Sequence, residues 1–385
     1  MKKIASVLLL ALLISALFVS CSAPGAANIN EIKIGINYEL SGEVATYGQS
    51  SVEGIELAIE QVNAAGGING KKIVPVKYDN KSEPSEATTL ANKLITQDKV
   101  IAILGPATSG SFMGQIPVAN KNKIPVASGS ATADDVTVTE NGVQEYAFRV
   151  CFNDSFQGTV MANFASENLS AKNAVVIMDS SSDYGKGLAK NFKSTFTAAG
   201  GTIVDEVAFV KGDTDFNAIL TKIKGQNFDV IYIPGYYNEA GLIIKQARAQ
   251  GITAPILGAD GFDSPTLLEL AGASALNDVY FTNHYSSLDQ DPNVLKFIDD
   301  FKAKYNKEPD AFNALGYDVA MFMIDAIGRS DALTGEAVKN ALEATEGFVG
   351  VTGTLSVDEN HNPVKSIVVI GLKDGKQDSS LKVNP

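Results

Sequence analysis

The chain has 385 residues, of which 45% are hydrophobic and 19% are charged, which is typical of a globular protein and long enough for two domains of ordinary size. Its formal net charge is −13, and such an acidic surface repels phosphate backbones and anionic lipids. A nucleic-acid-binding function is therefore not expected.

The N-terminus has the pattern of an export signal. Two lysines precede an apolar run that ends directly before Cys21, and the run is shorter than the roughly 20 apolar residues of a membrane-spanning helix. We expect residues 1–20 to be a signal peptide. Cys21 could be an ordinary residue after the cleavage site, but it resembles a bacterial lipobox cysteine, although Phe18 stands where that motif prefers Leu. We expect a lipid on Cys21, with 21–30 as a tether.

From residue 31 onward, short β-branched segments alternate with amphipathic segments, as in parallel sheets covered by helices. The first intervening helix, for example, places Val52, Ile55 and Ile59 on one face. The predicted strands form two successive sets, at 31–40, 72–78, 100–105 and 124–128, and then at 174–180, 202–210, 229–235 and 254–260. The pattern predicts an α/β protein with two Rossmann-like lobes and parallel-rich sheets.

The chain is expected to cross between the lobes three times. An extended stretch at 146–155 leaves the first set, so we place the first crossing near Phe152. The helices expected at 293–305 and 311–328 have no strands of their own and need a sheet to cover, so we assign them to the first lobe. The predicted boundaries are 31–152 and 285–353 for lobe 1, and 153–284 and 354–385 for lobe 2.

Polar side chains follow the strands of both sets, and ligands of open α/β sheets bind beyond the carboxyl ends of strands. In the first lobe, Ser109, Ser130 and Thr132 supply neutral hydroxyl groups near helix starts, which suit a carboxylate. In the second lobe, Asp260 ends the last strand and suits an ammonium. A zwitterion would therefore bridge the lobes. Four aromatic residues could enclose its side chain: Tyr47, Tyr184, Tyr236 and Phe312.

Each of these residues also has a purely structural interpretation. Ser109 and Thr132 could cap helices, and Tyr236 could be simple packing. Asp260 could be a turn residue before Gly261, but an acid at the end of an apolar strand needs a partner. The common placement at strand ends favours binding.

An enzyme is a weaker hypothesis. The two histidines, His284 and His361, are far apart and lack metal-ligand spacing, and no Gly-x-Ser-x-Gly motif surrounds Ser109. We expect no catalysis, no metal and no cofactor. His284 is better interpreted as a hinge or crevice residue, and Cys151 as buried packing.

Several segments together resemble a known family, namely GGINGKKIVPVKYDNKSEP, GPATSGS, SGSATA, YGKGLAKNFK, DFNAILTKIK, GYYNEAGLIIKQAR and DQDP. Over residues 31–372 the chain looks like the leucine/isoleucine/valine-type substrate-binding proteins of ABC importers. The resemblance implies a type I periplasmic-binding fold with a three-strand hinge. It also implies capture of a free, neutral amino acid, such as a branched-chain one, for delivery to ABC permease subunits by a monomeric binding protein.

The resemblance also implies individual roles. Asp260 would be the acidic partner of the ligand amino group, but the branched-chain binders carry glutamate there, so leucine itself is in doubt. The other implied roles are the carboxylate site at Ser109, contact with both ligand charges by Thr132, a main-chain carbonyl from Ser130, a position near the ammonium for Tyr236, and pocket walls from Tyr184, Tyr47 and Phe312.

Two alternatives stay open from sequence. The protein could report its ligand to a membrane receptor instead of feeding an importer, because the same two-lobed closure serves both functions. The ligand could also be a related molecule, such as an amide or a short peptide. Neighbouring permease and ATPase genes would favour transport, and a receptor gene would favour sensing.

Overall fold

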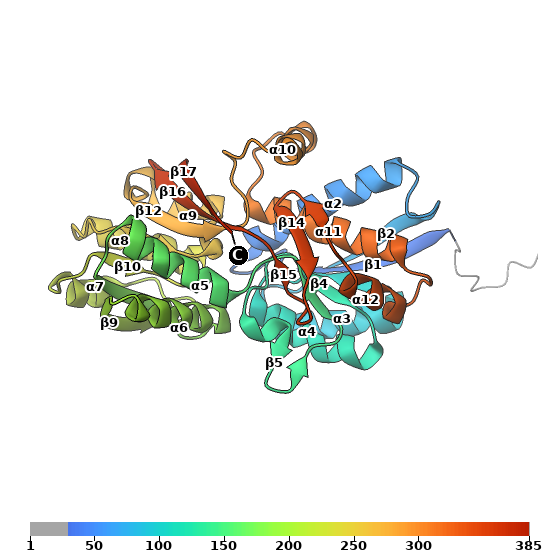
Figure 1. Ribbon diagram of the computed structural model, residues 1–385, viewed down its shortest axis with the longest axis horizontal. Helices are drawn as coiled ribbons and strands as arrows, with labels where there is room; N and C mark the ends of the chain where they lie inside the picture. The colour runs from blue at the N-terminus through green and yellow to red at the C-terminus, as the bar shows by residue number, and fades with distance from the viewer. Residues whose placement is uncertain (1–29, 385) are drawn as a thin grey trace, which may run out of the picture.

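The computed structural model describes residues 30–384 and shows two α/β lobes side by side (Figure 1). The predicted signal peptide and Cys21 lie outside the described residues, as does all of the predicted tether except its last residue. Among residues 30–384, no helix combines the length and the apolar character that a membrane crossing requires.

The first sheet is entirely parallel, in the order β2-β1-β3-β4-β7. Strand β1 lies between β2 and β3, so that Ile34 is opposite both Pro75 and Ala102. The strands are β1 (Glu31–Tyr38), β2 (Lys72–Asp79), β3 (Ala102–Leu104), β4 (Val126–Ser128) and β7 (Ala147–Arg149). The first helices along this part of the chain are α2 (Ala45–Ala64), α3 (Pro84–Lys93) and α4 (Ser109–Asn122).

The second sheet has the order β17-β16-β12-β11-β10-β8-β9, parallel from β9 to β12 and antiparallel at β16 and β17. Its strands are β8 (Asn173–Asp179), β9 (Thr202–Phe209), β10 (Val230–Tyr232), β11 (Ile256–Gly258), β12 (Val279–Asn283), β16 (Ile367–Lys373) and β17 (Lys376–Val383). The accompanying helices are α5 (Asp154–Asn163), α6 (Asp183–Ala198), α7 (Asn217–Lys224), α8 (Tyr237–Ala249) and α9 (Pro265–Ala271). The predicted α/β fold with two parallel-rich sheets is therefore confirmed.

Three later helices return to the first lobe: α10 (Pro292–Tyr305), α11 (Ala311–Arg329) and α12 (Gly335–Glu343). Helix α11 runs against α2 (Figure 1). Their backbones come so close that a Cβ on Gly54 would lie 2.0 Å from the carbonyl oxygen of Asn313, and one on Gly316 would lie 2.0 Å from that of Ser51. Glycine at these two positions lets α11 cover the first sheet, and this fixes the place of Phe312 at the start of the helix.

Short elements complete the chain. The small sheets contain β5 (Val138–Thr139), β6 (Gly142–Val143), β13 (Phe348–Gly350), β14 (Gly353–Val357) and β15 (Pro363–Val364). The π-helical turns are η1 (Leu94–Asp98) and η3 (Phe164–Asn168), and the 3₁₀ turns are η2 (Asp134–Val136), η4 (Asp260–Phe262) and η5 (Ala273–Ala275).

Residues 354–385, which are predicted to belong to lobe 2, contact both lobes. Strands β16 and β17 extend the second sheet, but Asn362 accepts hydrogen bonds from Arg149 and Thr137 of the first lobe at 2.8 Å and 2.7 Å. Lys365 is buried and donates to the Val150 carbonyl at 3.1 Å, so it ties two of the crossing segments together. The buried polar contacts hold 354–364 against lobe 1, and we propose that the third crossing lies near Lys365.

Candidate functional site

The first-lobe face of the cleft is built around the start of helix α4. Glu39 is fully buried, and its carboxylate accepts hydrogen bonds from the main-chain N–H groups of Ala107 and Thr108 at 3.0 Å and 3.1 Å. Burial raises the pKa of Glu39, and these N–H donors oppose that shift. Because Glu39 accepts hydrogen bonds from the N–H groups just before the helix, the N–H groups from Ser109 onward remain available to bind an anion at the helix N-terminus.

The hydroxyl groups of this face differ in how far their own lobe satisfies them. Ser109 Oγ accepts from the N–H of Ala133 at 3.0 Å, which leaves its proton for another acceptor. Ser130 Oγ donates to the Ala107 carbonyl at 2.9 Å. Thr132 Oγ1 is buried and has no hydrogen-bond partner among the described residues. Of the three predicted hydroxyl groups, those of Ser109 and Thr132 thus retain the capacity to bind a ligand.

The second-lobe face presents one carboxylate, held from several directions. Asp260 is 3% exposed, and its Oδ1 accepts from the Tyr184 hydroxyl at 2.7 Å, while Oδ2 lies 3.3 Å from His284 Nε2. Its main-chain N–H donates to Gln157 Oε1 at 2.8 Å. Burial lowers the pKa of His284 to about 4, against the opposing effect of the Asp260 carboxylate. His284 is therefore neutral near pH 7 and adds no positive charge beside Asp260.

Aromatic rings from both lobes meet over this carboxylate. Tyr47 stacks on Phe312 with ring centroids 4.3 Å apart, and Tyr184 stacks on Tyr236 at 5.0 Å. The two stacks touch where Tyr47 meets the Tyr236 ring edge-on at 5.7 Å. The Tyr47 hydroxyl also donates to the Gly261 carbonyl across the cleft. The rings exclude water from the acid, which strengthens its interaction with any bound cation.

All the predicted binding residues except Thr132 line one inner cavity between the lobes. The residues around it are Tyr47, Ala107, Thr108, Ser109, Ser130, Tyr184, Tyr236, Asp260, Gly261 and Phe312. Its volume is about 10 Å³, which is room for about one water molecule. A ligand of amino-acid size can therefore enter only if the lobes separate. Each residue's contact with a ligand remains a prediction.

The comparisons with known proteins agree with this geometry. The family model described as periplasmic binding protein matches residues 31–377. The chain belongs to the periplasmic binding protein family. It is 32% identical over 353 residues to Leu/Ile/Val-binding protein homolog 3 of Brucella melitensis, covering 91% of this chain and 93% of the relative.

Two solved structures of the same family resemble the chain closely. The branched-chain amino acid transporter substrate-binding protein LivJ of Streptococcus pneumoniae, in complex with isoleucine, is 43% identical with a TM-score of 0.88, covering 92% of this chain and 100% of the other. The leucine-binding protein LivK of Thermotoga maritima is 38% identical with a TM-score of 0.86, covering 92% and 99%.

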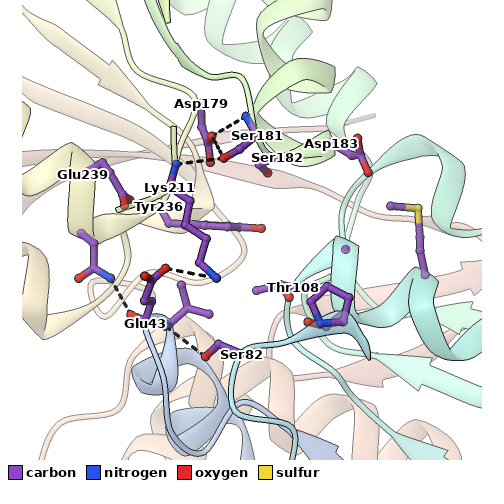
Figure 2. A pocket seen from close by; sticks show the side chains of 16 residues that line it. Glu43, Ser82, Thr108, Asp179, Ser181, Ser182, Asp183, Lys211, Tyr236 and Glu239 are labelled. Atoms are coloured by element: carbon purple, nitrogen blue, oxygen red, sulfur yellow. Dashed lines mark hydrogen bonds and ion pairs between the residues drawn. The ribbon is translucent and has the colours of Figure 1, made fainter. Parts of the chain in front are cut away.

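A larger outer cavity of about 550 Å³ adjoins the inner one and shares Thr108 and Tyr236 with it. Figure 2 shows Lys211 of the second lobe reaching across this space to Glu43 of the first, with Nζ 3.3 Å from the carboxylate. Lys211 also lies 3.7 Å from Glu83. The partly exposed ion pairs cross the mouth of the cleft, whereas the buried Asp260 carboxylate and the Ser109 hydroxyl line the inner cavity. The inner cavity is therefore the candidate binding site, and the outer cavity is its candidate entrance.

Sequence reasoning missed several residues that shape the site. Gln157 joins the main-chain N–H of Asp260 to the Thr282 hydroxyl, with both donors 2.5–2.8 Å from its Oε1. His284 was expected only as a hinge or crevice residue, and Glu39 was not singled out. Gln157 lies on α5, just after the first crossing segment, and His284 directly follows β12. Glu39 directly follows β1, and an acid at the end of an apolar segment could have been recognised from the sequence.

Proposed function

We propose that this protein is the extracytoplasmic substrate-binding component of an ABC importer, and that it captures a free neutral amino acid between its lobes. The observation that carries the proposal is the buried Asp260 carboxylate facing the start of helix α4 across the inner cavity. A helix N-terminus with hydroxyl donors favours an anion, and a buried carboxylate favours a cation. A zwitterion satisfies both faces at once.

Binding would proceed in two steps. The ligand carboxylate first docks on the N–H groups and hydroxyl groups of Ser109 and Thr132 while the lobes are apart. Closure then brings Asp260 and Tyr236 onto the ammonium. The closed form gains direct contacts between the lobes, since the Tyr237 hydroxyl donates to the Glu43 carbonyl at 3.0 Å. A ligand that touches both faces stabilises the closed form by its differential affinity for that form.

The ligand side chain would lie among the aromatic rings. These rings form a compact, largely apolar enclosure, which favours a small aliphatic side chain over a charged one. The related LivJ structure contains isoleucine, and its relatives carry Leu/Ile/Val-binding names, which supports a branched-chain ligand. Asp260 is one methylene shorter than glutamate, which changes how deep the ligand sits, so a binding screen across the neutral amino acids identifies the preferred side chain.

The location and partners follow from the same proposal. Export by the signal at 1–20 and acylation of Cys21 would hold the protein at a membrane surface, with residues 21–30 as a flexible tether. The loaded, closed form would then meet the permease subunits of the importer as a monomer.

A thermal-shift screen of residues 28–385 tests the proposal. The compounds are the free amino acids, their decarboxylated amines and a few sugars. A ligand at about a thousand times its Kd should stabilise the protein by roughly 4 kcal/mol, which is a readily measured rise in Tm. We expect a shift with a few neutral amino acids and none with the amines. No shift with any amino acid would contradict the proposed function.

A further inference from the structure

One hydrogen bond between the lobes joins two segments that also supply residues to the inner cavity. Asp263 directly follows the turn η4 in the second lobe, and its main-chain N–H donates to the Asp260 carbonyl at 3.0 Å. Its Oδ2 accepts from the main-chain N–H of Ala311, the first residue of α11 in the first lobe, at 2.9 Å. The same oxygen accepts from Asn283 Nδ2 at 2.8 Å, which fixes the carboxylate within its own lobe. Because Phe312 follows Ala311, this contact forms when the two faces of the cleft meet.

The start of α11 already carries an acid of its own. Asp310 is the N-cap of this helix, with Oδ1 accepting from the Asn313 N–H at 2.9 Å and Oδ2 accepting from Ser50 Oγ at 2.7 Å. Since Ala311 directly follows Asp310 in the chain, a carboxylate that binds the Ala311 N–H lies close to that of Asp310. A helix N-terminus favours either carboxylate, but the two charges repel each other. Closure therefore brings two carboxylates, one from each lobe, to one helix end.

The surroundings of the two acids supply little positive charge. Within residues 30–384, neither carboxylate forms an ion pair, and Lys307, whose charge favours the ionised form of Asp310, is 2.8 Å from Glu53. Both Asp263 and Asp310 are partly exposed, so a proton can reach them from solvent. The other titratable groups around the pair are Asp260, whose charge acts on Asp263, and Tyr285, whose pKa is raised by burial, by both acids and by Glu308 and Asp289.

The pKa of Asp310 reflects this crowding of charge. Burial first, and then the charge of Asp263, raise the pKa of Asp310 to about 7. Burial also raises the pKa of Asp263. With the lobes apart, the Asp263 charge is removed from the start of α11, so the pKa of Asp310 should be lower in the open form. A group whose pKa is higher in the closed form takes up a proton on closing, and closing is then favoured as the pH falls.

We propose that Asp263 and Asp310 form an acid latch between the lobes, which takes up one proton from solvent when the ligand closes the cleft. The proton is shared by the two carboxylates and leaves when the lobes separate. This inference rests on the proposed function, because it requires closure around a ligand. Neither acid lines the inner cavity, so both are positioning residues that act on the closed form and not on the ligand.

Titration calorimetry of the parent protein with L-isoleucine, the ligand in the related LivJ structure, tests the acid latch. Measurements in buffers of different ionisation enthalpy give the number of protons taken up per ligand. At pH 7 we expect uptake of about half a proton, because the pKa of Asp310 in the closed form is about 7. The affinity of the parent should rise by about tenfold or more between about pH 8 and about pH 5.

Two isosteric variants separate the acid latch from a merely structural role. Asp310→Asn keeps an N-cap of equal quality, and Asp263→Asn keeps an amide oxygen that can accept from the Ala311 N–H. Each variant removes one of the two repelling charges. We expect each to lower proton uptake by about half a proton at pH 7 and to raise the affinity at pH 8 by about threefold or more. The loss of a structural contact would instead weaken binding at every pH.

Asp79→Asn is the matched control, because Asp79 is also a partly exposed acid that accepts main-chain N–H donors. Its partners, Leu40 and Ser41 at 3.0 Å and 3.1 Å, lie in its own lobe, so this variant should keep the proton uptake of the parent. A parent that binds no amino acid would overturn the proposed function together with this inference. Binding without proton uptake, uptake that both latch variants retain, or an equal loss of affinity at every pH in both would overturn the acid latch alone.

Discussion

The two faces of the cleft are built on opposite principles. The first-lobe face offers neutral donors, and much of it is fixed by hydrogen bonds within its own lobe, such as those that Glu39 accepts from the loop before α4 and the one that Ser130 donates to Ala107. The second-lobe face concentrates buried acid, with Asp260 held by Tyr184 and lying beside His284. The first face can therefore receive an anion without rearrangement, whereas the second depends on a cation to complete it.

This difference suggests a division of labour. A prearranged donor face suits the initial capture of a ligand, and an acidic face that is incomplete alone makes closure depend on the ligand. Substitutions on the second face should therefore have the larger effects on ligand affinity and on the pH dependence of the protein, because they remove charged interactions and not only neutral hydrogen bonds.

The largest effect is expected for Asp260→Ala. Leaving a buried ammonium without its carboxylate costs about 3–5 kcal/mol, so amino-acid affinity measured by calorimetry should fall by more than about a hundredfold. Asp183→Ala is the control, because this acid lies in the outer cavity on the same lobe and pairs with Lys186 near the surface. It should change affinity by less than about twofold. If the Asp260→Ala protein bound amino acids as tightly as the parent, the inferred difference in charge between the two faces would be contradicted.

A titrating group on the second face, His284, should also make the free energy of unfolding depend on pH. Folding lowers the pKa of His284 from 6.5 to about 4, so the folded state disfavours the protonated ring. This group contributes stability fully above pH 6.5, and the contribution is lost as the pH falls towards 4, by at most about 3 kcal/mol.

Urea unfolding of the parent and His284→Gln at several pH values between 7 and 4 measures this contribution. The free energy of unfolding of the variant should decline less over that window. Asp154 and Glu39, whose pKa values are raised, respond to acid in the opposite direction, but they are present in both proteins and cancel in the difference. Parallel curves for the two proteins would show that His284 does not titrate as its burial requires.

The sequence was sufficient to predict most of the architecture. Runs such as Glu31–Tyr38 and Asn173–Asp179 are β-branched and apolar because their sheets are covered on both sides, and both are strands. The same logic placed Ser109 and Asp260 just beyond strand ends, and the structure brings them to one cavity because the carboxyl ends of strands from both sheets face the space between the lobes.

The positions of the other site residues depend on how the two lobes meet, which the sequence pattern does not show. Gln157 and His284 lie near the crossings, and nothing in their local sequence shows that both contact Asp260. The contacts of 354–364 with lobe 1 could not be predicted for a similar reason. Those contacts come from single buried polar residues such as Asn362, which have no periodicity to detect.

A smaller effect is expected on the first face. Thr132→Val keeps the shape of the side chain and removes only a hydroxyl that has no partner among residues 30–384. Amino-acid affinity should fall about tenfold, the value of one hydrogen bond to a charged group. Ser130→Ala is the control, because its hydroxyl already donates to Ala107 and only its main-chain carbonyl is expected to face the ligand. An equal loss for both variants in calorimetry would mean that the two hydroxyl groups do not differ as the structure indicates.

The smallest effect should come from the mouth of the cleft. Lys211 bridges to Glu43 and Glu83 with a side chain that is 45% exposed, so solvent and salt screen these pairs. Lys211→Met should weaken ligand binding by about twofold to threefold at low salt and not at all at high salt, because the pairs form only when the lobes meet. Lys222→Met is the control, since Lys222 pairs with Asp205 within the second lobe at 2.8 Å and cannot sense closure. A salt-independent loss for Lys211→Met would mean that the outer residues contact the ligand itself, and the boundary between entrance and site would then move outward.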